Sequence, residues 1–214
     1  MSLIKLLTRI TLTAIFASAL LLSSAMTARA TEQATLLVFG DSLSAAYGLE
    51  EDQGWVTLLE QRIAEQGKAI RVINASVSGE TTTGGRSRLP SLLASHAPSH
   101  ILIELGGNDG LRGLPLAVIR ENLIAMIELA QNSGAVVIIA GMQIPPNYGP
   151  RYTAPFFEQY AELAEDYDLY LIPFLIEGIP QRPELIQDDG IHPVAEAQPM
   201  ILDNVWPVLL DALD

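Results

Sequence analysis

Ser42 follows Leu36-Leu37-Val38-Phe39, the first apolar run after residue 30. A serine hydroxyl becomes an effective nucleophile only when a neighbouring base takes its proton. Near the carboxyl end, Asp189 and His192 lie three residues apart, so a tight turn can bring both side chains to one site. There, His192 could act as base and then as acid while Asp189 holds the imidazole in orientation. These three residues are therefore candidates for a nucleophilic triad.

Donors that could stabilise a developing negative charge follow the next two apolar runs. Gly79 allows the backbone to approach a ligand closely and to present an N–H group. Asn108 follows two glycines and offers side-chain N–H donors. Such groups stabilise an oxyanion when they are preorganised where the charge develops. The two segments therefore add a candidate oxyanion-binding site to the candidate triad.

Each of these features also has a simpler interpretation. Ser42 could cap a helix, since serine is a favoured N-cap residue. The segment around Gly79 and the glycine-rich segment around Asn108 could be ordinary turns. Gly79 and Gly84 have phosphate-loop spacing, but the required lysine and hydroxyl residue do not follow, which excludes a nucleotide site.

A metal site formed by Asp188, Asp189 and His192 is a further alternative, although no second histidine lies nearby in the sequence. His96 and His100 fall around the start of the third apolar run and are typical of surface or helix-end positions. The combination of nucleophile, oxyanion donors and acid–base pair favours the catalytic interpretation over these alternatives.

The chain alternates short apolar runs with helical patterns, which predicts an α/β fold with a parallel sheet and helices on both faces. In such sheets, sites form at the carboxyl ends of the strands, where Ser42, Gly79 and Asn108 fall. Ser42 is expected between a strand and a following helix. The expected strands are residues 36–39, 70–75, 101–103, 136–139 and 169–174.

Helical spacing of apolar residues is found in four later segments. Residues 55–63 and 116–130 have clear apolar stripes. Residues 152–167 are expected to be helical after Pro155. Residues 195–213 are expected to form the last helix, with Pro199 and Pro207 interrupting or kinking it.

Residues 1–30 have the pattern of a secretory signal peptide: a positive start, an apolar centre and the ending Ala28-Arg29-Ala30. The alternative is a retained membrane anchor, because the 19 uncharged residues 10–28 could just span a bilayer. Residues 31–214 are expected to form one domain that depends on packing, because the chain has no cysteine. Removing three basic residues with the signal changes the formal net charge from −13 to −16, which disfavours nucleic acid and anionic membranes as partners.

Four segments together resemble the motif blocks of the SGNH (GDSL) hydrolases, in the family's order. Within that family the chain is most similar to the bacterial periplasmic thioesterase I / lysophospholipase L1 / arylesterase group. The segments are Gly40-Asp41-Ser42-Leu43, Gly79, Gly106-Gly107-Asn108-Asp109 and Asp189-Gly190-Ile191-His192.

The resemblance implies Ser42 as nucleophile, His192 as base and Asp189 as its orienting partner. It implies an oxyanion hole formed by the N–H groups of Ser42 and Gly79 and the Asn108 side chain. The implied fold is a three-layer α/β/α, flavodoxin-like structure with strand order 2-1-3-4-5. The implied reaction is hydrolysis of carboxylic esters and thioesters, with no cofactor and no metal.

The implied substrates are small acyl esters or thioesters, including aryl esters and lysophospholipids, and a monomeric periplasmic or secreted enzyme is expected. Residues 111–115 and 144–148 could wall an apolar acyl groove, or could simply be connecting loops. The alternatives are a short-chain or carbohydrate acetyl esterase on the same fold and a catalytically inactive binding module of the cell envelope.

Overall fold

Five parallel strands form the centre of the fold, in the order β2-β1-β3-β4-β5. The structure is a computed structural model that describes residues 33–50 and 52–213. The expected signal peptide lies outside these described residues. The strands are β1 (Ala34–Gly40), β2 (Ile70–Asn74), β3 (His100–Glu104), β4 (Val136–Ala140) and β5 (Tyr170–Ile172). Both the parallel sheet and the predicted strand order are confirmed.

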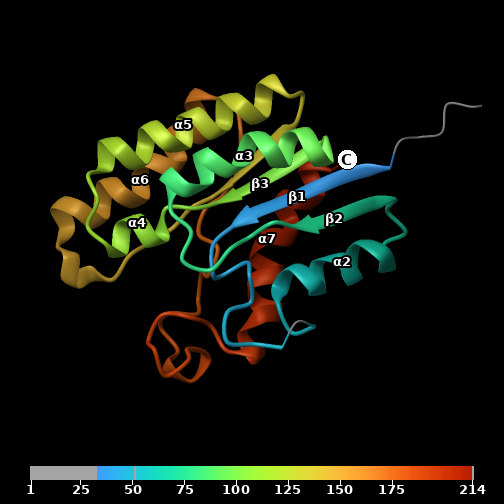
Figure 1. Cartoon of the computed structure of the whole chain (residues 1–214). Helices are drawn as coiled ribbons and strands as arrows, with labels where there is room; N and C mark the ends of the chain where they lie inside the picture. Colours follow the sequence, from blue (N-terminus) through green and yellow to red (C-terminus); the bar gives the residue numbers. More distant parts are fainter. Residues whose placement is uncertain (1–32, 51, 214) are drawn as a thin grey trace, which may run out of the picture. The chain divides into compact units, whose positions relative to one another are not determined.

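Helices cover both faces of the sheet (Figure 1), as the alternation of strands and helices predicted. On one face lie α3 (Thr82–His96), α5 (Leu116–Asn132) and α6 (Pro150–Asp166). On the other lie α2 (Trp55–Glu65) and α7 (Gln198–Ala212).

Alternate residues of β1 enter two separate hydrophobic cores. Leu37 and Phe39 belong to the core under α3, α5 and α6, whereas Leu36 and Val38 belong to the core under α2 and α7. All four side chains are fully buried. Burial on both faces explains why the strand sequence is continuously apolar.

The segment after Ser42 differs from the prediction, because turns rather than a helix follow β1. The next helix begins only at Trp55. Ala46 and Gly48 both have positive φ angles, of 55° and 76°, which are incompatible with a right-handed helix. Ser42 therefore lies in an irregular loop at the carboxyl edge of the sheet.

The boundaries of two other helices also differ from the prediction. Helix α6 begins at Pro150, and Pro155 lies inside it rather than before it. In α7, Pro199 lies in the first turn, where a missing N–H is tolerated, and only Pro207 is internal. The short helix α4 (Gly107–Leu111) was not predicted.

A long connection between β5 and α7 carries the predicted acid–base pair. It contains two 3₁₀ turns, η2 (Pro183–Leu185) and η3 (Ala195–Ala197). An antiparallel bridge between Ile186 and Pro193 closes the turn between them. The Gln187 N–H also donates to the His192 carbonyl at 2.7 Å. Another 3₁₀ turn, η1 (Pro146–Tyr148), precedes α6, and no helix in the described part of the chain has the length and apolarity to cross a bilayer.

Candidate active site

The structure brings Ser42, His192 and Asp189 into one hydrogen-bonded line. Ser42 Oγ lies 2.8 Å from His192 Nε2. His192 Nδ1 lies 2.6 Å from Asp189 Oδ2. With the imidazole proton on Nδ1, the ring donates to the carboxylate and Nε2 can accept from the serine hydroxyl. A proton can therefore pass from the serine to the imidazole without a change in geometry.

Local hydrogen bonds fix the turn that holds Asp189 and His192. Asp189 Oδ1 accepts from the N–H groups of Ile191 at 2.9 Å and His192 at 3.0 Å. Burial by itself would raise the pKa of Asp189, but the hydrogen bonds from His192 and Ile191 outweigh it and lower the pKa to about 2. The carboxylate is therefore available to orient the imidazole across the neutral pH range.

Tyr47 and Gln187 join this turn to the loop that follows Ser42. The Tyr47 and His192 rings lie with their centroids 4.5 Å apart. Gln187 Nε2 donates to the carbonyl of Tyr47 at 2.9 Å and to that of Pro193 at 3.0 Å. These contacts connect the two loops that carry Ser42 and His192.

Three N–H groups are available around Ser42 Oγ. The backbone N–H groups of Ser42 and Gly79 have no hydrogen-bond acceptor among residues 33–50 and 52–213. The Asn108 amide donates one N–H to Asp41 Oδ2 at 3.0 Å, which leaves its second N–H free in this part of the chain. All three residues line one cleft with His192. Unpaired N–H groups of this kind are the donors that stabilise an oxyanion when they are preorganised around it.

The loops that carry these donors are joined below the cleft. Asp109 Oδ2 accepts from the Thr82 N–H at 2.9 Å, and its Oδ1 accepts from the Thr82 hydroxyl at 2.6 Å. Both side chains are fully buried. On the exposed side, Arg112 Nη2 donates to the Gly79 carbonyl at 3.3 Å. The loop with Gly79 and the helix with Asn108 are therefore held together at two places.

A sequence model of the GDSL-like Lipase/Acylhydrolase family matches residues 38–198 of this chain. The chain belongs to this family. The match begins within β1 and includes strands β2 to β5, the loops with Ser42, Gly79 and Asn108, and the turn with Asp189 and His192.

Two curated proteins and one solved structure are closely similar to this family member. Esterase TesA of Pseudomonas aeruginosa is 51% identical over 82% of this chain and 87% of the relative. Thioesterase 1/protease 1/lysophospholipase L1 of Escherichia coli K12 is 40% identical over 83% and 84%. The crystal structure of TesA has a TM-score of 0.81, with 50% identity over 83% of this chain and 99% of that one.

In this GDSL-like protein, two buried carboxyl groups lie beside the nucleophile loop. Burial raises the pKa of Asp41 to about 6, although hydrogen bonds from Leu43 N–H, Glu104 and Asn108 oppose the rise. Burial and the Asp41 charge raise the pKa of Glu104 well above its usual value. Glu104 Oε2 also accepts from the Ser44 hydroxyl at 2.7 Å. Glu104 therefore retains its proton to a higher pH than an ordinary glutamate.

A cleft of about 640 Å³ opens beside the triad of this GDSL-like protein. Both loops suggested as groove walls contribute: Leu111 from the first, and Ile144, Pro145 and Pro146 from the second. Residues 112–115, 147 and 148, which were also predicted as walls, do not line the cleft. The Tyr148 hydroxyl instead donates to the Leu111 carbonyl at 2.6 Å. Further apolar lining is provided by Leu43, Met142, Phe174, Ile176, Pro180, Ile186 and Ile191.

The described residues contain no cluster of three or more histidine, aspartate and glutamate side chains that could hold a metal ion. Asp189, one member of the suggested metal set, is instead hydrogen-bonded to His192. His96 is the last residue of α3, and His100 is the first residue of β3. Neither element brings its histidine to Ser42, Asp189 and His192.

Glu104, Tyr47 and Gln187 were not predicted from the sequence as parts of the site. Glu104 had one recognisable signal, because a carboxyl at the end of an otherwise apolar strand must have a buried polar partner or a proton. Tyr47 and Gln187 have no such signal, since their contact joins residues 140 positions apart.

Proposed function

We propose that this family member hydrolyses carboxylic esters and thioesters through an acyl-enzyme on Ser42. The observation that carries the proposal is the continuous line of contacts from Ser42 Oγ to His192 Nε2 and from His192 Nδ1 to Asp189 Oδ2. The esterase and thioesterase names of relatives 51% and 40% identical support the same class of reaction.

In the first half of the reaction, Ser42 Oγ attacks the acyl carbon while His192 Nε2 takes the hydroxyl proton. The negative charge on the carbonyl oxygen is stabilised by the N–H groups of Ser42 and Gly79 and by the free N–H of Asn108. Collapse of the tetrahedral intermediate breaks the bond to the leaving alcohol or thiol. His192 supplies its proton to the leaving group where one is needed.

In the second half, water attacks the acyl-enzyme while His192 takes one of its protons. The same donors stabilise the second oxyanion. The bond from the acyl carbon to Ser42 Oγ breaks, the serine regains its proton from His192, and the carboxylic acid leaves. No step requires a metal or an organic cofactor.

The apolar lining of the cleft supports an acyl chain as the group bound beside the triad, because burial of each methylene stabilises the complex by about 0.8 kcal/mol. We propose medium or long acyl groups, in aryl esters, thioesters or lysophospholipids. A short-chain acetyl esterase is the alternative, and it would leave most of this cleft unused.

We also propose that residues 1–30 are removed as a signal peptide and that residues 31–214 act in the periplasm or outside the cell. The apolar centre of that segment and its Ala28-Arg29-Ala30 ending support export. A monomer is proposed as the active form, with the complete cleft provided by one chain.

The test is hydrolysis of p-nitrophenyl esters with two to sixteen acyl carbons by the mature protein and by Ser42→Ala. We expect turnover to peak at medium or long chains and to disappear in Ser42→Ala, with an unchanged circular dichroism spectrum. A chelator should leave the rate unchanged. Activity confined to acetate would favour the acetyl esterase, and equal activity of Ser42→Ala would overturn the assignment. A folded protein without activity at any length would favour the binding module.

A further inference from the structure

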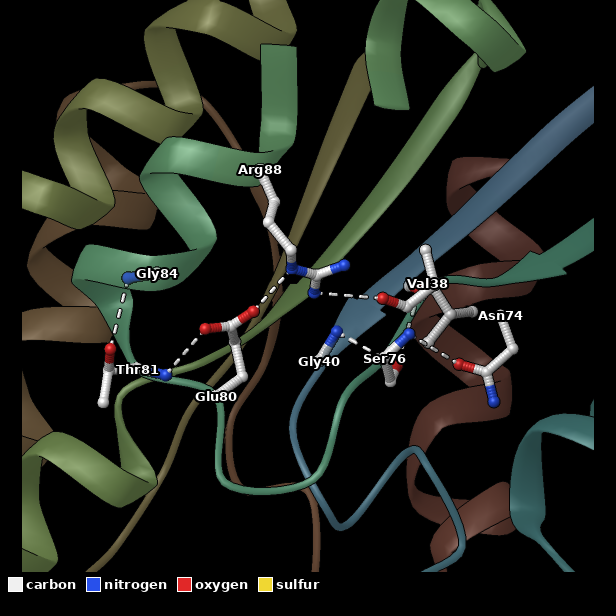
Figure 2. Close-up of polar contacts among 9 residues, drawn as sticks. Val38, Gly40, Asn74, Ser76, Glu80, Thr81, Gly84 and Arg88 are labelled. Carbon is white, nitrogen blue, oxygen red and sulfur yellow. Dashed lines mark hydrogen bonds and ion pairs between the residues drawn. The ribbon is translucent and has the colours of Figure 1, made fainter. Parts of the chain in front are cut away.

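The loop between β2 and α3 carries Gly79 in its second half, and its first half continues the hydrogen bonding of the sheet. The Ala75 N–H donates to the Val38 carbonyl at 2.9 Å. The Gly40 N–H donates to Ser76 Oγ at 3.1 Å, and the close-up in Figure 2 shows this contact beside β1. The start of the loop is therefore fixed to the strand that leads to Ser42.

The second half of the loop is held by a side chain from α3. Arg88 Nε donates to Glu80 Oε2 at 2.5 Å, and Arg88 Nη2 donates to the Ala75 carbonyl at 3.1 Å. One guanidinium group thus contacts Ala75, which opens the loop, and Glu80, which directly follows Gly79. Figure 2 shows the contact between Arg88 and Glu80. The loop that presents the Gly79 N–H is closed across its base by Arg88.

The surroundings of Arg88 favour this one arrangement. Its guanidinium carbon lies 5.0 Å from the centroid of the buried Phe39 ring. This cation–π contact restricts the orientation of the planar guanidinium group. Glu80 Oε1 accepts from the Thr81 N–H at 3.2 Å. A Cβ atom at Gly84 would collide with Glu80 Oε1, so glycine at this position leaves the space for the carboxylate.

Gly79 has a φ angle of +79°, and nothing lies near the position of a Cβ atom there. A glycine in open space has wide conformational freedom, so the direction of its N–H group must be set by the residues around it. Oxyanion donors are effective only when they are preorganised. The Glu80 N–H donates to the Val77 carbonyl at 3.1 Å and closes a turn around Gly79. Arg112 holds the Gly79 carbonyl, and Arg88 holds the Glu80 side chain that follows this turn.

We propose that Arg88 is a positioning residue for the oxyanion hole, and that its bridge from the Ala75 carbonyl to Glu80 fixes the direction of the Gly79 N–H. The inference rests on the proposed function, because it assigns a role within the same site. Arg88 does not contact the reacting atoms and acts through the loop. A lysine cannot replace it fully, because an ammonium group lacks the planar fork that serves two acceptors.

Arg120 provides a matched control for the contribution of an ion pair to stability. It lies on α5 and donates to Glu162 at 2.8 Å and to Asp166 at 3.0 Å. Its side chain is 31% exposed, against 33% for Arg88. Partly exposed pairs of this kind contribute little to stability. The carboxylates differ more, since Glu80 is 11% exposed but Glu162 and Asp166 are 61% and 58% exposed. Tm is therefore compared with kcat in each variant, to separate a loss of stability from an effect on the loop with Gly79.

The experiment compares Arg88→Gln, Arg88→Lys and Arg120→Gln in the mature protein. The readouts are kcat and KM for a medium-chain p-nitrophenyl ester, Tm, and inhibition by two ligands. An alkyl boronic acid forms a tetrahedral anion on the serine and needs the oxyanion hole. The corresponding fatty acid occupies the acyl groove without forming that anion.

We expect Arg88→Gln to lower kcat roughly 10- to 100-fold, which is less than the loss of a complete oxyanion donor. Its KM should stay within about twofold of the wild type, as expected for an interaction used in the transition state. Boronate inhibition should weaken in parallel with kcat, while fatty-acid inhibition should not change. Arg88→Lys should restore part of kcat, and Arg120→Gln should retain all of it.

The second step is to combine Arg88→Gln with Glu80→Gln and, separately, with Asn108→Ala. The first pair should be strongly non-additive in kcat, because both residues belong to one bridge. The second pair should be close to additive, because the two changes affect separate donors. Additive losses in the first pair would contradict the bridge.

Wild-type kcat in Arg88→Gln, with Ser42→Ala inactive, would overturn this inference and leave the proposed function intact. Two other outcomes would mean that Arg88 has only a structural role. In one, kcat falls while inhibition by the boronate and inhibition by the fatty acid weaken equally. In the other, kcat falls in Arg88→Gln and is not restored at all in Arg88→Lys. Absence of ester hydrolysis in the wild type would instead refute the proposed function itself.

Discussion

Glu104 Oε2 accepts a hydrogen bond at 3.1 Å from the backbone N–H of Asp41, so a fully buried acid on β3 supports the loop that carries Ser42. Its other oxygen, Oε1, is buried without a hydrogen-bond partner among the described residues. A Cβ atom on Gly40 would collide with Glu104 Oε2, which shows how closely the strand end and the carboxyl approach. The nucleophile loop therefore rests on a carboxyl group that is costly to ionise.

We expect the stability of Glu104→Gln, measured relative to that of the wild type at the same pH, to increase as the pH rises. Because the pKa of Glu104 is raised on folding, the unfolded chain loses this proton at lower pH than the folded chain. Between these two values the folded state binds more protons, so raising the pH destabilises the wild type, and glutamine lacks this loss. Values of Tm at pH 5 and pH 8 for both proteins test the expectation. A difference in Tm that does not change with pH would contradict it.

Replacing Asp189 by asparagine should lower kcat roughly 10⁴-fold, the loss known for the matching exchange in serine proteases. Asparagine no longer fixes the proton on Nδ1 of His192 and cannot stabilise the imidazolium. Asp188→Asn is the matched control, since Asp188 is the adjacent exposed carboxylate. Equal losses in both variants would revive the metal alternative, which uses both residues.

The rate should fall as the pH is lowered from 8 to 5. His192 must be unprotonated at Nε2 to accept the serine proton. Asp41, with a pKa of about 6, also gains its proton there and then holds the Asn108 amide less firmly. Asp189, with a pKa of about 2, stays ionised throughout.

Because two groups must lose protons, log(kcat/KM) against pH should reach a slope above one on the acid side. The profile is measured with a p-nitrophenyl ester between pH 4 and pH 9, with Tm followed in parallel to exclude unfolding. A rate that is flat from pH 5 to pH 8 would argue against a histidine base.

Gly79→Ala should lower kcat about tenfold or more, whereas Gly67→Ala should leave it unchanged. The two glycines form a matched pair: their φ angles are +79° and +67°, and neither has an atom near the position of a Cβ. Each substitution places an alanine in the left-handed region, at a cost of about 1 kcal/mol in stability. Tm is measured by thermal unfolding and kcat by ester hydrolysis. If both variants lose the same Tm but only Gly79→Ala loses kcat, the loss of activity comes from the geometry of the site and not from backbone strain. Full activity of Gly79→Ala would count against its donor role.

The sheet was predictable because its three central strands, β1, β3 and β4, are apolar on both faces and each strand is followed by a recognisable turn. The last predicted strand, residues 169–174, proved too long: β5 ends at Ile172, immediately before Pro173. The start of α6 was misplaced because a proline normally marks a first turn. Pro155 instead lies five residues into the helix, where only one backbone hydrogen bond is lost.

The candidate triad residues and the proposed oxyanion donors could be named from the sequence because each lies in a short local motif. The residues that support them could not. Glu104 and Gln187 depend on contacts between distant segments, such as the 140-residue separation of Gln187 and Tyr47. The hydrogen-bond partners of Arg88 lie only 8 and 13 positions away, but across a loop whose path the sequence did not specify. A local pattern carries no information about such pairs, and many arginines and glutamines at similar positions lie on the surface.

Ser42 and His192 stand 150 positions apart in the chain, one just after the first strand and the other just before the last helix. Asp189 and His192, by contrast, meet within a single turn. The long-range contact must therefore wait for closure of a very large loop, whereas the local one need not. During refolding from denaturant, recovery of catalysis would consequently report the final docking of the carboxyl-terminal segment and would lag behind the recovery of secondary structure.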